Sequence, residues 1–341
     1  MLISLITSGI GNTAIGYEAM KVHTTGAKNI AIGYAAMDDT DAGSTSLDSD
    51  HNVFIGVNSG GGTWANTKSE QNVAIGNSTM DAAMDGALYN TTVGYASLSS
   101  LTTGDNNTAL GHQAANAITT AAGNIAIGNS AMLVHTTGDY NIAIGTSAMD
   151  NTDAGSTALS STENIFMGYD AGGGTWADAA SNQNVAIGNY AMDSALDGAL
   201  NNTAVGYASL GAITTGDSNT ALGHNAGTAI TTGAENVTIG AASGDSILGG
   251  NYNTILGSSS APTLAGGSYN NIIGRRAGYS LSSGGYNAAL GSAALYSLQT
   301  GTGNVGVGQS AGYNFTGGGG VFMGYEAGHG VASGDVVFFG Y

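Results

Sequence analysis

Apolar and polar positions alternate in one short phrase that returns along the whole chain. The phrase begins with Asn, continues with an aliphatic or β-branched residue, a small residue and a second aliphatic residue, and closes with Gly, as in NTAIG from Asn12 and NIAIG from Asn29. Alternate side chains of a β-strand point to opposite faces. We therefore expect the two aliphatic residues to face the core and the residue between them to face a neighbouring surface.

The closing glycine recurs nineteen times with a period that can be counted. Most steps are 17 residues long, and six steps that together span 112 residues, including steps of 23, 20 and 18, are repeated in the same order by the next six. Residues 17–128 and 129–240 are thus tandem duplicates, residues 241–341 continue as regular coils, and residues 1–10 are expected to form a cap or entry strand. A fixed short period of this kind predicts stacked structural units.

Glycine content and period together favour strands over helices. The chain has 58 Gly in 341 residues, and each Gly inside a helix costs about 1 kcal/mol. We predict an all-β protein, one parallel β-solenoid (β-roll) of about 19 coils over residues 11–341. Each coil is expected to carry a second short strand, around sequences such as YEAM at Tyr17 and YASL at Tyr95. The repeated Asn is expected to form an amide ladder from coil to coil.

Composition and charge exclude several classes of function. Apolar residues make up 42% of the chain, enough for a core, although only 8% of residues are charged against about 25% in ordinary domains. The net charge is −18 with five Lys and Arg, so nucleic-acid binding is not expected. No apolar span reaches the length of a membrane helix and no Sec signal is evident. Without Cys there are no disulfides.

The phrases NTAIGYEA, NIAIGNSA and NVAIGNST resemble the head repeats of YadA-type trimeric autotransporter adhesins, and equally the repeat regions of bacteriophage tail fibres. The resemblance implies a parallel β-roll in which three chains pack side by side, with the small strand residue toward the neighbouring chain. It implies a homotrimer with these interface residues: Ala14, Ala31, Phe54, Ala74, Ala109, Ala126, Ala143, Phe166, Ala186, Ala204 and Ala221. The coils are longer than usual head coils, and stalk heptads, a membrane anchor and a cleavage domain are not found, which favours a fibre shaft or processed fibre.

Recognition is expected in the coils that the long steps enlarge, residues 38–71 and 150–183, because loops on a rigid scaffold commonly carry binding. Trp64 and Trp176 occupy equivalent places there, beside flexible glycines. Such an aromatic residue either stacks on a sugar ring or fills the loop or a groove between subunits, and the sequence leaves both alternatives open.

Acidic residues in the same coils match part of a calcium loop. Asp39 and Asp41, with Asp153 in the second copy, follow the first positions of a D-x-D-x-G pattern, although the rest of the ligand set is missing. A solvated acidic loop and a calcium site are therefore alternatives. No other cofactor is expected.

The remaining titratable residues point to structure rather than chemistry. His23 and His135, like His112 and His224, lie one block apart and are expected to be surface or stacked histidines, not metal ligands. The pair Asp81 and Asp85, copied as Asp193 and Asp197, is the only regular carboxylate pair, and we expect it to be a solubilising patch rather than a hydrolytic centre. No catalytic residue and no metal ligand are predicted.

The sequence therefore predicts a structural and adhesive protein that is not an enzyme. We expect a trimeric shaft of a phage tail fibre, or of a related fibre at the extracellular surface, that contacts a host glycan or surface protein. A polysaccharide-cleaving tailspike and an ice-binding solenoid, suggested by the stacked threonines, are the alternatives.

Overall fold

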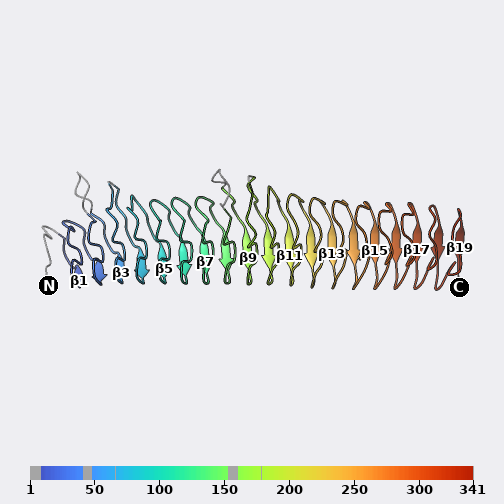
Figure 1. The fold of residues 1–341 in the computed structure, drawn as a ribbon, viewed down its shortest axis with the longest axis horizontal. Coiled ribbons are helices and arrows are strands. Elements are labelled where there is room, and N and C mark those ends of the chain that lie inside the picture. Colours follow the sequence, from blue (N-terminus) through green and yellow to red (C-terminus); the bar gives the residue numbers. More distant parts are fainter. Residues whose placement is uncertain (1–8, 41–47, 66, 153–159, 178, 341) are drawn as a thin grey trace. The chain divides into compact units, whose positions relative to one another are not determined.

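A computed structural model describes residues 9–40, 48–65, 67–152, 160–177 and 179–340, and divides the chain into two compact units, residues 1–180 and 181–341. Among these residues the regular elements are all three-residue strands, and no helix occurs (Figure 1). The first unit holds β1 Thr13–Ile15, β2 Ile30–Ile32, β3 Val53–Ile55, β4 Val73–Ile75, β5 Thr91–Val93, β6 Thr108–Leu110, β7 Ile125–Ile127, β8 Ile142–Ile144 and β9 Ile165–Met167.

The second unit repeats the same coil. It holds β10 Val185–Ile187, β11 Thr203–Val205, β12 Thr220–Leu222, β13 Val237–Ile239, β14 Thr254–Leu256, β15 Asn271–Ile273, β16 Ala288–Leu290, β17 Val305–Val307, β18 Val321–Met323 and β19 Val337–Phe339. Within each unit successive strands pair in parallel and in register, so that Ala109 of β6 lies opposite Ala126 of β7. The predicted all-β fold, a parallel β-solenoid with a 17-residue period, is confirmed.

The segment after each closing glycine is a turn, and the prediction of a second strand there is wrong. The second and fourth residues after the glycine have left-handed backbone angles, with φ of 59° at Glu18 and 52° at Met20 in the first coil. A strand requires extended backbone, so the segment winds tightly instead. Its peptide groups still bond to the neighbouring coils, for example from Ala35 N to Tyr17 O at 2.9 Å.

The closing glycine is required by both its backbone angle and its neighbours. Gly33 has a φ of 146°, and a Cβ built on it would lie 2.1 Å from the carbonyl oxygen of Gly56 in the next coil. Any other residue would clash with that carbonyl and be strained at this φ. The glycine therefore lets neighbouring coils approach closely where the strand turns.

The middle residue of each strand points into the coil's own core, so the predicted facing is wrong. The side chains of Ala31 and Phe54 are fully buried within the chain, as are the other predicted interface residues apart from Ala14, which is partly exposed in the first coil. Side chains buried in this way cannot contact a neighbouring chain. The middle position is often Ala, but it also accepts larger side chains, as the fully buried Ile255 of β14 and Ile272 of β15 show.

Large and small side chains alternate inside the coils. Where the middle strand residue is Phe54, the fourth residue after the closing glycine is Gly60, and a Cβ there would lie 2.6 Å from the Phe54 ring. Where the middle residue is Ala74, the corresponding residue is Met80, which is fully buried. The interior thus keeps a roughly constant volume, as dense packing requires.

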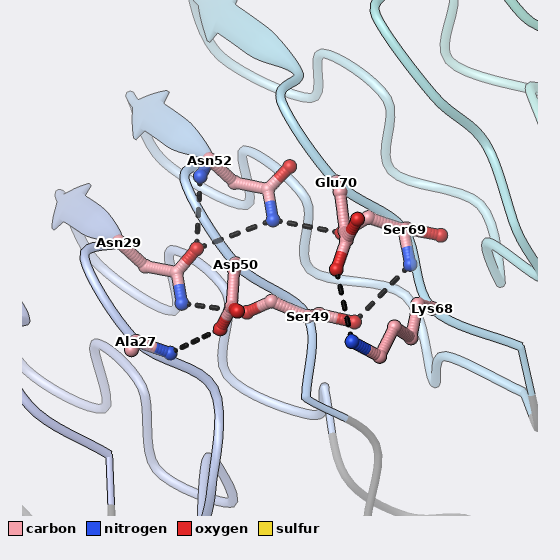
Figure 2. A network of polar contacts seen from close by, with 8 residues as sticks. All are labelled: Ala27, Asn29, Ser49, Asp50, Asn52, Lys68, Ser69 and Glu70. Atoms are coloured by element: carbon pink, nitrogen blue, oxygen red, sulfur yellow. Dashed lines mark hydrogen bonds and ion pairs between the residues drawn. The ribbon is translucent and has the colours of Figure 1, made fainter.

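The predicted asparagine ladder is confirmed, and Figure 2 shows one part of it. The side-chain oxygen of Asn29 accepts hydrogen bonds from the backbone N and the Nδ2 of Asn52, at 2.9 and 3.2 Å. Asn29 Nδ2 donates to Ser49 O at 2.7 Å, and Asn52 Nδ2 donates to Ser69 O at 2.8 Å. Because these amides are buried and bonded on both sides, the ladder fixes the register between coils.

Candidate functional site

The first and third residues of each strand form the outer strand face of their unit. Since the middle residue points inward, these two neighbours point outward. In the third position every strand has an aliphatic, Met or Phe residue, and in the first position mostly Thr, Val or Ile. In-register pairing places them in two columns, as Ile127 opposite Ile144 and Ile125 opposite Ile142 show.

The outer strand face is uncharged and open to solvent in the single chain, and its third-position column is apolar. Many third-position side chains, from Leu110 at 36% to Phe339 at 74%, are substantially exposed, and neither column contains a charged residue. Continuous exposed apolar surface of this extent is rare on monomeric soluble proteins and marks an interaction surface. The candidate interface is therefore the outer strand face, not the buried Ala and Phe residues at the middle strand position.

Both tryptophans lie in the core, so neither can stack on a sugar in this structure. Trp64 is 1% exposed and Trp176 is 2% exposed. Each indole Nε1 donates to the backbone oxygen of a nearby glycine, Gly60 at 3.2 Å and Gly172 at 3.0 Å. Of the two alternatives, the residue that fills the enlarged coil is the one that the geometry supports.

Each tryptophan packs against the phenylalanine of its own coil. The ring centroids of Phe54 and Trp64 are 5.7 Å apart in an edge-on arrangement, and those of Phe166 and Trp176 are 5.6 Å apart. The signal in the sequence was the phenylalanine itself, which occurs at the middle strand position in both of these coils. The glycine in the turn leaves space beside the phenylalanine ring, and the indole ring fills that space.

The acidic calcium-like loop is described only in part. Asp39 Oδ2 accepts a hydrogen bond from Thr63 Oγ1 at 2.6 Å, and Asp41 and Asp153 lie outside the described residues. Within the described ranges, no three His, Asp or Glu side chains are close enough together to hold a metal ion.

Four aspartates are held in surroundings that favour the protonated form. Burial raises the pKa of Asp38, Asp150 and Asp245, and one carboxylate oxygen of each has no hydrogen-bond partner. Burial also raises the pKa of Asp81, with a smaller contribution from the charge of Asp38.

The two members of the regular carboxylate pair have different surroundings in the first unit. Asp81 is half-buried at the turn, whereas Asp85 Oδ1 accepts a hydrogen bond from the backbone N of Thr67 at 2.8 Å. A carboxylate engaged by the backbone acts as a structural cap. Asp193 and Asp197 repeat the pair in the second unit.

The histidines divide into two kinds. His112 stacks on Tyr95 at 5.4 Å and His224 on Tyr207 at 5.3 Å, as expected for stacked histidines. His23 is fully buried, contrary to that expectation, as is its second copy, His135.

The buried His23 is bonded through both ring nitrogens, to Thr40 Oγ1 at 2.7 Å and Gly26 O at 2.9 Å. A carbonyl oxygen only accepts, so Nε2 carries the hydrogen and Nδ1 accepts from the threonine. The ring then has no lone pair free for a metal.

The comparisons with known proteins give no relative. No protein-family model matches the chain, and neither a curated protein nor a solved structure is significantly similar to it. In the part of the chain that the structure describes, no helix has the length and apolar character needed to cross a membrane.

Proposed function

We propose that this chain is the shaft of a trimeric fibre, of the phage tail-fibre or surface-fibre type, in which copies pack side by side through their outer strand faces. The observation that carries the proposal is the apolar third-position column, which lies beside an uncharged first-position column on the outer strand face of each unit. With a net charge of −18, the other surfaces of the chain repel one another. Association is therefore favoured only where the apolar columns meet.

The fibre would act at the virion or at an extracellular surface and contact a host glycan or surface protein. Short coils bonded from one to the next through buried asparagines suit a load-bearing shaft. A solenoid that repeats one coil presents the same groups many times, so weak contacts add through avidity.

Placing a charge on the outer strand face tests the shaft. The Leu222 side chain is 47% exposed in the single chain, so Leu222→Glu is tolerated by the fold but buries a charge if copies pack there. We expect the wild type to sediment at about 100 kDa, for three chains of 33.5 kDa, and the variant to dissociate at least tenfold more readily.

Thr215→Glu is the charge-matched control, because Thr215 is exposed at a corner of a neighbouring coil, away from the outer strand face. It should sediment as the wild type does. A wild-type chain that stays at 33.5 kDa would exclude the trimeric shaft.

A further inference from the structure

Three tyrosines of the second unit form a stacked ladder on its surface. Tyr252, Tyr269 and Tyr286 each precede the ladder asparagine of their coil, and successive ring centroids are 4.9 Å apart with interplanar angles of 11° and 6°. This spacing is close to the distance of about 4.8 Å between neighbouring strands. Each ring therefore covers one face of the next.

The two ends of this ladder differ. At one end the hydroxyl of Tyr252 is hydrogen-bonded to Glu235, which raises the pKa of the tyrosine. At the other end the next coil has Gly303 in the tyrosine's place, and a Cβ built on Gly303 meets no atom within 4 Å. Tyr286 is 65% exposed, against 45% for Tyr252 and 47% for Tyr269. One face of the Tyr286 ring is thus covered by Tyr269, and the other borders open space.

The far side of this space is polar. Gly319 holds the same place one coil further on, and a Cβ built on it would lie 3.2 Å from Asp335 Oδ1. The Asp335 carboxylate therefore lies over Gly319. Thr302, which precedes Gly303, is exposed. An open aromatic face and a carboxylate thus lie at the two ends of a gap that spans the places of Gly303 and Gly319.

We propose that this gap, the tyrosine slot formed by Tyr286, Thr302, Gly303, Gly319 and Asp335, binds one pyranose ring of a carbohydrate. The sugar takes the position that a fourth tyrosine ring would take in the ladder. The face of an aromatic ring is electronegative and attracts the C–H groups on the apolar side of a pyranose. The Asp335 carboxylate accepts from sugar hydroxyls, and such charge-assisted hydrogen bonds are the stronger ones.

The charges select among sugars. The Asp335 carboxylate lies over Gly319 at one end of the slot, and the chain carries −18 overall, so uronic acids and other anionic sugars are repelled. Neutral hexopyranoses and amino sugars fit. The inference rests on the glycan contact proposed above and locates that contact at the tyrosine slot.

Saturation-transfer NMR on the full chain tests the slot. The probes are the methyl β-glycosides of glucose, galactose, glucosamine and glucuronic acid at millimolar concentration. We expect transfer to the C–H face of at least one of the first three and none to the glucuronide. Tyr286→Ala should reduce the signal at least fivefold.

Gly303→Tyr is the sharper variant, because it fills the slot and leaves every other slot residue in place. Gly303 has a φ of 73°, close to the 57° of Tyr286, so a tyrosine is tolerated there. It should abolish the signal as well. Tyr140→Ala is the matched control, because that exposed tyrosine of the first unit lies against Gly123, and it should keep the wild-type signal.

Three results would overturn the slot: no transfer to any neutral or amino glycoside, undiminished transfer in Gly303→Tyr, or a changed sedimentation mass in Tyr286→Ala, which would place the ring between copies. The failures are distinguishable. An intact surface polysaccharide that binds wild type and Gly303→Tyr equally leaves the glycan contact standing and removes the slot. A wild-type mass of 33.5 kDa excludes the trimeric shaft, whether or not the glycosides bind.

Discussion

At the scale of single residues, the interior of a coil decides which large side chain it admits. Phe54 and Trp64 share one coil because the turn opposite them has glycine at position 60. The indole that the sequence offered as a sugar platform is therefore part of the packing. The exposed aromatic rings that can stack on a ligand are those of tyrosines.

Trp64→Ala should destabilise the first unit by about 3–5 kcal/mol, the usual cost of removing a large buried aromatic residue. Thermal unfolding followed by circular dichroism measures the loss. Tyr140→Ala, which removes an exposed ring, should change stability by less than about 0.5 kcal/mol. Equal effects of the two variants would contradict the core position of the tryptophan.

In two coils the fifth residue after the closing glycine is a hydrogen-bond donor to the backbone. At this position Asn116 Nδ2 donates to Ala96 O at 2.9 Å, and Thr228 Oγ1 donates to Ala208 O at 3.0 Å. Asp245 stands at the same position with a buried oxygen that has no partner and with a raised pKa. An ionised carboxylate cannot donate, so the site favours a neutral group.

Asp245→Asn should therefore stabilise the chain at pH 7, by about 1 kcal/mol or less because the site is partly solvated. A raised folded-state pKa means that the folded chain binds a proton more readily than the unfolded chain. The wild type thus gains from this group as the pH falls, and the advantage of the variant should vanish below the ordinary Asp value of 3.8.

Urea unfolding at several pH values measures this difference. The control is Asp217→Asn, because Asp217 Oδ1 already accepts from Leu200 N at 2.8 Å and an amide oxygen can do the same. A constant advantage of Asp245→Asn across the pH range would show that protonation is not involved.

At the scale of the element, the middle strand residue and the fourth residue after the closing glycine pack against each other inside each coil. When one of the two is large, the other must be small. Ala74→Phe alone overfills its coil and should cost about 1–3 kcal/mol or more. Adding Met80→Gly reproduces the combination of Phe54 with Gly60 in the preceding coil. The double variant should recover most of the loss, as a double-mutant cycle of thermal unfolding would show. A neutral Ala74→Phe would mean that the residue faces outward.

At the scale of the whole molecule, the period in the sequence predicted the solenoid, its strands and its asparagine ladder, because those follow from backbone pairing repeated at a fixed step. The absence of the second strand could not be predicted, since the left-handed angles at residues such as Glu18 and Met20 leave no trace in residue type. The facing was predicted wrongly because aliphatic residues usually face a core, whereas here the middle strand residue and the turn residues opposite it fill the interior. The pairing of Phe54 with Gly60 was the available signal.

The candidate sites were less predictable than the fold. The tyrosine slot depends on a ladder that stops at a glycine, and its meaning is visible only when stacking distances are known. The tryptophans were singled out as unusual, but the sequence left open whether they bind a sugar or fill the coil. Rarity of a residue type indicates importance without saying whether its role is packing or recognition.

The most direct test of the central claim uses two single cysteines, because the chain has none of its own. Ala221→Cys places a thiol at the buried middle position of β12, and Leu222→Cys places one on the outer strand face. With a short bismaleimide, Leu222→Cys chains should become covalently linked to one another, and Ala221→Cys chains should stay unmodified until unfolded. Cross-linking through residue 221, with residue 222 giving none, would contradict the account.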